Sequence, residues 1–430
     1  MKKRITYILL TAIISWSMSS CSLTEEDLFS ESAAIRLNNS IANADTILVS
    51  AKNGWEMLYF PTKSSAGYNM LVKFDADFNV TVAAQNTLTT NGQYKTSKSL
   101  WDVIQGSGPI LTFNTYNDVL HAFSDPQDDG VGYEGDYEFI VLSADSNTLK
   151  LKGVKRGTII YMKRLAKNQS WTGYFEKLDS VNQTIFGRFS TTLKLQINGA
   201  EAFSLTNGNT HIFTFTPEGE SILDSGYEVP FIITNYGLQL LTPINQESSS
   251  AQEFVLSDDK NELVSEDGNT KIISQPASDV LIEIISAKKY MNFNYSDEHM
   301  SSIIKNAYYT IDSTVSAKTR KLEYIGFTNN KGWGTSLAIY TTKTSNKIEG
   351  FLSFTISETS ANELTLKFNN FGDSYDKNGK TYYDSYNLSD FVSLIEGEYI
   401  PTIIGHKLSS TTIRLTDKNN PNKWFDLDLK

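Results

Sequence analysis

The residues best spaced for metal chemistry lie in an acidic loop, SDPQDDGVGYEGDYEF at 124–139. Counted from Asp125, oxygen-bearing side chains recur at Gln127, Asp129 and Asp136, which is typical of a twelve-residue calcium loop. The last of these is Asp and not the bidentate Glu of such loops, and the proline and glycines equally well describe an acidic turn between a helix and a strand. Calcium at these four residues is therefore a hypothesis, and the sequence suggests no other cofactor.

Four tyrosines gather in a second polar segment, SYDKNGKTYYDSYN at 374–387, which contains the turn dipeptide Asn378-Gly379. They are Tyr375, Tyr382, Tyr383 and Tyr386. Because the segment is too polar for a core, we expect a protruding hairpin whose rings, apolar on the face and polar at the tip, stack on a sugar. Trp333, between two glycines, is expected at an exposed turn and joins this ligand-binding set. The alternative is a cross-strand aromatic ladder that stabilises a sheet edge.

The sequence contains no motif of a known catalytic centre. The four histidines are far apart and lack the spacing of a zinc site, and neither a phosphate-binding P-loop nor a GxSxG nucleophile elbow is present. Glycoside hydrolysis needs two carboxyl groups about 5–10 Å apart. The sequence contains acidic pairs such as Glu134 and Asp136, but it does not give the distance between their carboxyl groups. We therefore expect a protein that is not an enzyme, and glycoside hydrolysis is the less favoured alternative.

The first residues predict secretion. A basic segment at 2–4 precedes an apolar run at 5–16, which is shorter than the about 20 residues of a membrane-spanning helix. Small or flexible residues then lead to Cys21, the only cysteine, in an order that resembles the lipobox of bacterial lipoproteins. That resemblance implies a signal peptide at 1–20 and several acyl chains, palmitate among them, on Cys21, which together form a stable membrane anchor. The alternative is a free thiol in the leader.

The distribution of charged residues bears on where the protein is located and on which partners it binds. Acidic residues at 25–27 directly follow the anchor and resemble a Bacteroidetes signal for display on the outer face of the outer membrane, although a solvated tether explains them too. The chain has a net charge of −11, and removing the leader takes away basic residues only. An acidic body repels phosphate backbones, so we expect no nucleic-acid partner. The expected partners are the membrane through Cys21, a carbohydrate ligand, or an outer-membrane transporter.

Hydrophobic periodicity predicts the elements that position these residues. Apolar residues recur every three or four positions from Ala34 to Ala51 and predict an amphipathic helix. Downstream, apolar and polar residues alternate, as on both sides of the turn Asn198-Gly199. One polar face per strand favours antiparallel sheets. The predicted fold is mainly β with minor α, with antiparallel sheets in sandwich-like or barrel-like lobes, the N-terminal helix and a few short helices.

Length predicts more than one domain. After the signal peptide at 1–20, we expect an N-terminal helix with a β lobe at 21–165, a helix with β-hairpins at 166–285, and a C-terminal β lobe at 286–430. A faint repeat supports related first and last lobes. Residues 111–162 and 366–429 share the order strand, short helix, Gly-acid-Tyr, strand, hairpin, strand.

Several motifs together carry a family resemblance. They are NGW (53–55), YNMLVKFD (68–75), GPILTFNTYNDVLHAFSDP (108–126), GDYEFIVLS (135–143), NKGWG (330–334) and NPNKWFDL (420–427). With them the chain resembles the Bacteroidetes lipoprotein family catalogued as domain of unknown function 4302. The resemblance implies a secreted lipoprotein and assigns no catalytic residue. The expected function is non-catalytic binding of a glycan or nutrient at the cell surface, and the alternative is a structural subunit of an outer-membrane uptake complex.

Overall fold

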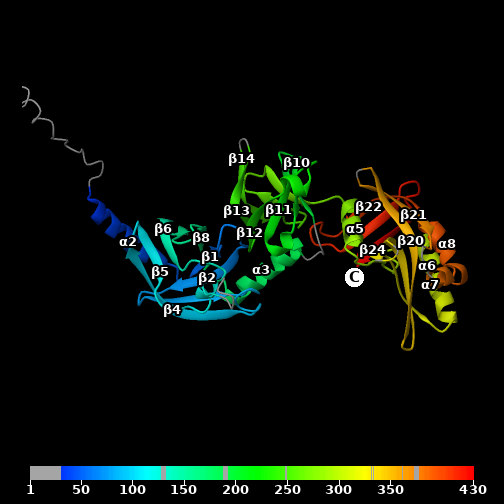
Figure 1. Ribbon diagram of the computed structural model, residues 1–430, viewed down its shortest axis with the longest axis horizontal. Helices are drawn as coiled ribbons and strands as arrows, with labels where there is room; N and C mark the ends of the chain where they lie inside the picture. The colour runs from blue at the N-terminus through cyan, green and yellow to red at the C-terminus, as the bar shows by residue number, and fades with distance from the viewer. Residues whose placement is uncertain are drawn as a thin grey trace, which may run out of the picture.

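Three closed antiparallel barrels of eight strands each lie in a row along the molecule (Figure 1). The computed structural model describes residues 31–126, 132–186, 192–246, 249–330, 332, 334–360, 362–371 and 377–430. The predicted fold class, mainly β with barrel-like antiparallel lobes and an N-terminal helix, is confirmed. The predicted signal peptide and Cys21 lie outside the described residues. None of the helices within them has the length and apolar character needed to cross a membrane.

In each barrel every strand pairs with the next along the chain, and the last strand pairs with the first. The first barrel comprises β1 (Trp55–Tyr59), β2 (Tyr68–Phe74), β3 (Asn79–Ala84), β4 (Lys95–Gln105), β5 (Pro109–Phe113), β6 (Glu138–Ala144), β7 (Thr148–Gly153) and β8 (Ile159–Arg164). The second comprises β9 (Leu193–Ile197), β10 (Ala200–Thr206), β11 (Ile212–Pro217), β12 (Tyr227–Thr234), β13 (Gly237–Gln246), β14 (Ser249–Leu256), β15 (Glu262–Ser265) and β16 (Thr270–Ser274). The third comprises β17 (Met291–Phe293), β18 (Lys321–Asn330), β19 (Gly334–Lys343), β20 (Asn346–Ser360), β21 (Glu363–Asn370), β22 (Gly397–Ile404), β23 (Thr412–Asp417) and β24 (Trp424–Leu429).

Each barrel is preceded by a helix that packs on it. These helices are α2 (Ala33–Ser50), α3 (Trp171–Phe186) and α5 (Ala277–Ser286). The other helices within the described residues are η1 (His121–Phe123), η2 (Gly208–Thr210), α4 (Ile222–Ser225), α6 (Ser302–Ala317), α7 (Lys377–Ser385) and α8 (Leu388–Ile395). Helix α2 is the predicted N-terminal helix, and it buries Ala44 and Leu48 in the first core. The indole of Trp55 donates to the carbonyl of Leu48 at 2.9 Å and so joins the helix to β1.

Apolar and polar side chains alternate along the strands, and the apolar ones fill the interiors of the barrels. Leu193 and Leu195 point into the second barrel and are fully buried, while Lys194 between them reaches solvent and pairs with Glu218. Inward apolar side chains form one core in each barrel, and closure pairs the first strand of each barrel with its last. Size and closure therefore supply the stability that disulfides give smaller secreted domains.

Helix α5 packs on the third barrel, although all of it except its last residue lies before the predicted boundary at 285/286. Val280, Leu281 and Ile284 belong to the core that β17–β24 enclose. Apolar periodicity predicts a buried helix face but not which sheet covers it. The faint repeat does map onto equivalent places, because 111–162 runs from within β5 to within β8 of the first barrel and 366–429 runs from within β21 to the end of β24 of the third.

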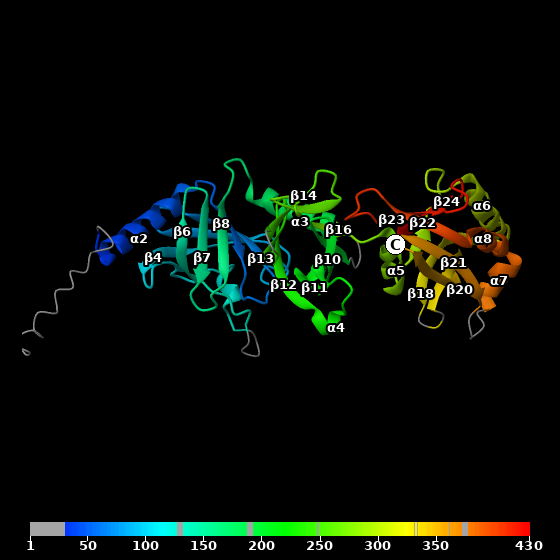
Figure 2. The same cartoon turned by 90° about the horizontal axis from the view of Figure 1, so that it is seen from above.

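A loop of the third barrel reaches into the second. Leu408, between β22 and β23, is fully buried in the second core. On either side, the ring Nδ1 of His406 lies 2.8 Å from the carbonyl of Asp259, and the backbone N–H of Lys407 donates to the side chain of Asn261 at 2.8 Å. Figure 2 shows this loop crossing from the third barrel to the second.

Candidate functional site

The tyrosine segment forms a helix, so the predicted hairpin is wrong. Helix α7 contains the dipeptide Asn378-Gly379 in its first turn. A Cβ on Gly379 would lie 2.2 Å from the carbonyl oxygen of Phe351, so this glycine lets the helix approach β20 closely and does not form a turn. Tyr382 is 3% exposed, and its hydroxyl lies 2.5 Å from that of Thr341. It therefore belongs to the third core.

The other predicted ligand-binding rings are used within the protein or lie outside the described part. Tyr383 is half-buried and stacks on Phe368 with centroids 5.3 Å apart. Tyr386 contacts the Tyr382 ring and has the ammonium of Lys318 3.9 Å from its centroid. Tyr375 and Trp333 are not among the described residues. A role of these residues in ligand binding stays a prediction.

The two described members of the predicted calcium loop serve the first barrel. The carboxylate of Asp136 accepts the backbone N–H of Lys155 at 2.9 Å and of Arg156 at 2.8 Å, and so holds the turn between β7 and β8. Asp125 accepts the hydroxyl of Tyr116. Gln127 and Asp129 lie outside the described residues, where calcium binding stays a prediction. Within the described ranges, no group of three or more His, Cys, Asp or Glu side chains is placed to hold a metal ion.

A pocket of about 540 Å³ lies on the outer face of the third barrel, beside its first and last strands. This volume is within the range of about 300–1,000 Å³ of small-molecule sites. Helix α6 forms one wall through Tyr308, Asp312 and Ser316, whose four-residue spacing places them on one helix face. The strands and the chain next to them form the other wall, through Asn292, Asn294, Tyr295, Lys321, Glu323, Tyr324 and Asp428.

Strand alternation places polar side chains on this outer face. Met291 and Phe293 point into the core, so Asn292 between them points outward. In register, Asn292 lies between Asp428 of β24 and Gly326 of β18. A Cβ on Gly326 would lie 2.2 Å from Asn292 Oδ1, so the amide occupies the space that a side chain at 326 would fill. Asn292 is 7% exposed, and its Oδ1 has no hydrogen-bond partner among the described residues.

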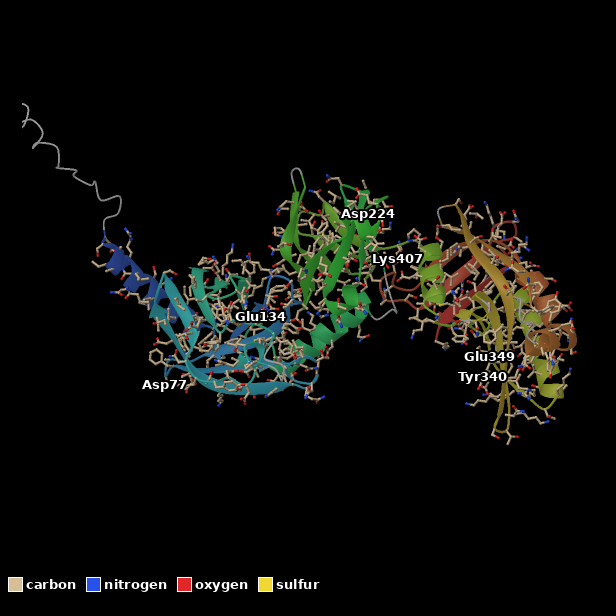
Figure 3. All side chains as sticks on the ribbon, in the orientation of Figure 1. Asp77, Glu134, Asp224, Tyr340, Glu349 and Lys407 are labelled. Atoms are coloured by element: carbon tan, nitrogen blue, oxygen red, sulfur yellow. The ribbon has the colours of Figure 1, made fainter. Side chains whose placement is uncertain are left out.

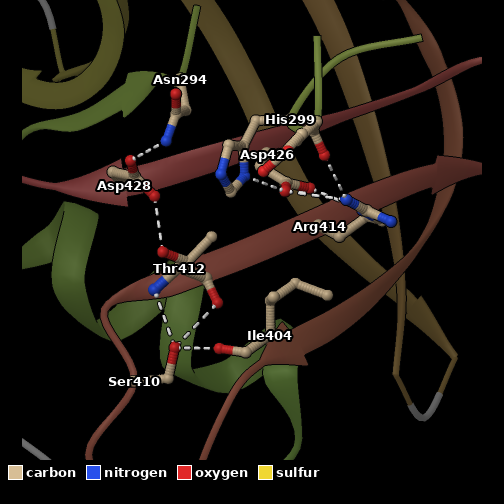
Figure 4. A network of polar contacts seen from close by, with 9 residues as sticks. Asn294, His299, Ile404, Ser410, Thr412, Arg414, Asp426 and Asp428 are labelled. Carbon is tan, nitrogen blue, oxygen red and sulfur yellow. Dashed lines mark hydrogen bonds and ion pairs between the residues drawn. The ribbon is translucent and has the colours of Figure 1, made fainter. Parts of the chain in front are cut away.

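The same outer face carries a hydrogen-bond network that continues from the pocket (Figure 4). Asp428 accepts from Asn294 Nδ2 at 2.5 Å and from Thr412 Oγ1 at 2.6 Å. Two residues earlier, the fully buried Asp426 accepts from Arg414 Nε at 2.7 Å and lies 2.7 Å from His299 Nδ1. Both carboxylates are thus held by neighbouring side chains and fix the strands and the chain before α6 in place.

Tyrosine rings supply the pocket with apolar faces and hydroxyl donors. Tyr295, 38% exposed, stacks on Tyr308 with centroids 4.7 Å apart. Burial, followed by the negative charge of Asp312, raises the pKa of Tyr308 far above its usual range, so the hydroxyl stays protonated. Asp312 itself has no hydrogen-bond or ion-pair partner within the described ranges, and it is half-buried.

The other ring of the pocket, Tyr324, is held from behind by a carboxylate. Glu349 Oε1 accepts the hydroxyl of Tyr324 at 2.8 Å and that of Tyr290 at 2.9 Å. Burial, then the hydrogen bond to Glu349, raises the pKa of Tyr290 to about 12. Tyr340, which pairs with Glu349 across the strands (Figure 3), stacks on Tyr324 with centroids 5.2 Å apart. The ring of Tyr324 is therefore held by a hydrogen bond at its hydroxyl and by stacking on its face.

Sequence reasoning missed this pocket because no local motif marks it. Asn294 and Asp428 are 134 residues apart and meet only because β17 pairs with β24 to close the barrel. The available signal was weak: Asn292 and Asn294 alternate with apolar residues, which predicts one face for both but not its neighbours.

Comparison with known proteins identifies the family of this chain. A search of curated proteins found no significant match. The family model described as domain of unknown function 4302 matches residues 25–258, which is more than half of the chain and includes the whole first barrel. The matched segment ends before the third barrel, so it does not contain the pocket residues. The family resemblance expected from the sequence is confirmed, and the chain belongs to the family catalogued as domain of unknown function 4302.

Proposed function

We propose that this protein is an outer-membrane lipoprotein, anchored through Cys21 and facing the cell exterior, that binds a glycan in the pocket of the third barrel without hydrolysing it. The observation that carries the proposal is the combination of an exposed tyrosine ring, Tyr295, with the buried amide of Asn292 and the half-buried carboxylate of Asp312 in one open pocket. The leader and Cys21 support the location.

The pocket matches the two kinds of surface that a sugar presents. A pyranose ring has apolar C–H faces, which pack on tyrosine rings such as Tyr295 and Tyr324. Its hydroxyl groups both donate and accept, and the pocket provides a half-buried acceptor at Asp312 that has no partner among the described residues. A ligand hydroxyl that donates to this carboxylate forms a charge-assisted hydrogen bond, and that gain favours binding.

The carboxylates of the pocket favour binding over hydrolysis. Asp428 is held by two side chains, and Glu323 pairs with Lys321 at 2.8 Å and accepts from Thr342 at 2.6 Å. Asp312 is then the one aspartate or glutamate side chain of the lining without a partner among the described residues. Glycoside hydrolysis uses two carboxyl groups with different roles, so a single available group fits a binding site better.

A glycan array probed with the full chain tests the proposal, followed by titration calorimetry with the best glycan. Tyr295→Ala is expected to weaken binding about tenfold, since losing one stacking ring costs about 1.4 kcal/mol or more. Tyr236→Ala is the matched control, because Tyr236 is 67% exposed in the second barrel and does not line the pocket. Equal loss in both variants, or no loss in either, contradicts the assignment of the site. Release of free sugar during the titration contradicts the non-catalytic part.

The location has its own test. The proposal expects acyl chains on Cys21 by intact-mass analysis and loss of membrane partitioning in Cys21→Ser. A Cys21→Ser variant that stays with the membrane as firmly as the wild type contradicts the anchor and leaves the binding site untouched.

A further inference from the structure

The first and second barrels meet through several contacts, one of which is a small apolar joint. Leu58 and Phe60 of the first barrel pack against Ile232 of the second in a cluster separate from the barrel cores. Tyr161 of β8 packs on the edge of this cluster. Lys163 of β8 forms an ion pair with Glu253 of β14, which joins the two barrels beside the apolar contact. Sites for small ligands occur preferentially at such junctions between domains.

A second pocket, of about 390 Å³, lies at this joint. Tyr161 comes from the first barrel, and the other lining residues come from β13, β14, the end of β15 and the turn after it. Gln239 of β13 lies in register between Ile232 of the joint and Glu253 of the ion pair. It lines the pocket and points away from the second core, because its neighbours Leu238 and Leu240 fill that core.

Gln239 brings an unpaired hydrogen-bond acceptor to the pocket. The residue is 3% exposed, and its Oε1 has no partner among the described residues. A buried acceptor of this kind is costly unless a donor reaches it. The side chain of Gln252, which also lines the pocket, cannot supply that donor, because its amide nitrogen donates to the carbonyls of Leu240 and Leu241.

The charge of the pocket is negative. Its lining includes Glu253, Glu266 and Asp267 and no lysine or arginine. Glu253 is paired with Lys163, and hydrogen bonds led by that of Ser265 hold the pKa of Asp267 below its usual value, so it is ionised at neutral pH. Glu266 is exposed and has no partner within the described ranges. Ionised carboxylates and an unpaired amide oxygen all accept hydrogen bonds, so the fitting ligand is a donor.

We propose that this pocket binds a small organic cation with protonated amines, held between the two barrels. Its amine nitrogens donate to Gln239 Oε1 and to the carboxylates of Glu266 and Asp267. The ring of Tyr161, which also has the ammonium of Lys150 5.8 Å from its centroid, packs on the carbon chain of the ligand. A bound cation contacts both barrels at once and therefore stabilises the joint. This inference does not depend on glycan binding, because the pocket of the third barrel shares no residue with it.

Titration calorimetry of the full chain with 1,4-diaminobutane tests the inference, and 1,4-butanediol is the matched neutral compound. We expect one diamine bound per chain and at least tenfold weaker binding of the diol. Equal affinity for the two compounds overturns the inference, because the argument requires charge as well as hydrogen bonding. Binding of several diamines with no saturable site overturns it as well, since it shows only attraction to an acidic protein.

Two charge-matched variants separate the site from the overall charge. Glu266→Gln is expected to weaken diamine binding about threefold, as suits an exposed ion pair. Glu220→Gln removes the same charge from an exposed position that does not line the pocket and is expected to leave binding unchanged. Gln239→Met keeps the side-chain length, removes the amide and is expected to weaken binding as well. Equal effects of the two glutamate variants, or full affinity in Gln239→Met, overturn the inference.

Discussion

Asp426 is the most deeply buried charge of the polar face on the third barrel, and replacing it with asparagine tests whether that face holds the barrel together. The carboxylate is fully buried and accepts from Arg414 Nε at 2.7 Å and Nη2 at 3.0 Å, and it lies 2.7 Å from His299 Nδ1. Asparagine has the same shape but no charge, and its NH₂ group faces donors. The variant therefore leaves at least one guanidinium N–H without an acceptor.

The expected loss follows from this geometry. Breaking a buried ion pair by removing one partner costs about 3–5 kcal/mol. The side chains of Arg414 and His299 are 30% and 32% exposed, so water rehydrates them in part and the lower end applies. We expect Asp426→Asn to reduce the free energy of unfolding by about 3 kcal/mol and to lower the melting temperature of the third barrel by about 10 °C.

Scanning calorimetry of the full chain measures this loss, and hydrogen exchange at the amides of β23 and β24 assigns it to the third barrel. Asp428→Asn is the matched control on the same strand and face. Asp428 accepts from neutral groups only, Asn294 and Thr412, so its substitution is expected to cost about 1 kcal/mol. If Asp426→Asn costs no more than Asp428→Asn, the buried charge network does not stabilise the barrel and the reasoning is refuted.

Three further predictions concern the joints and the buried titratable groups. Leu408→Ala removes a side chain that fills the second core from the third barrel and is expected to cost about 2–5 kcal/mol in chemical unfolding, whereas Leu223→Ala, at a 92% exposed position, costs nothing measurable. Burial lowers the pKa of His211 from 6.5 to about 4, so the unfolded chain binds a proton at a higher pH than the folded chain does. As the pH falls from 6.5 to 4, the free energy of unfolding is therefore expected to fall by about 3 kcal/mol. His211→Gln is expected to abolish this loss. Glu56 accepts the Tyr174 hydroxyl at 2.6 Å, and burial raises its pKa. The stability that its neutral form provides is lost as the pH rises through the folded pKa. Glu56→Gln is therefore expected to unfold at a higher denaturant concentration than wild type at pH 8, and at the same concentration below the ordinary pKa of 4.5.

These expectations have distinct contradictions. Equal unfolding of Leu408→Ala and Leu223→Ala shows that the second and third barrels do not share a core. A pH profile that His211→Gln leaves unchanged places the acid sensitivity elsewhere, and a Glu56→Gln variant less stable than wild type at pH 8 shows that the carboxylate is needed in its charged form.

Local patterns in the sequence determined the fold class. Period-two alternation, as in Leu193 and Leu195, predicted antiparallel strands with one buried face, and the stripe from Ala34 to Ala51 predicted α2, because side-chain periodicity follows directly from backbone geometry. The family match was likewise readable from short motifs. Local patterns failed where tertiary contact outweighed propensity. Asn378-Gly379 is a strong turn signal, yet its glycine lies in a helix because β20 needs a close backbone approach there.

Only the tertiary structure decided where binding groups meet. Closing a barrel pairs its first and last strands, so Asn292 and Asp428 become neighbours although they lie at opposite ends of the domain's sequence. Packing two barrels together placed Tyr161 beside Gln239 in the same way. Residues far apart in sequence carry no record of such contacts in composition or spacing, because strand pairing and barrel contact depend on the whole packed surface. The sequence alone therefore determined three kinds of information, namely fold class, family and a candidate anchor, while the pockets came from the folded chain.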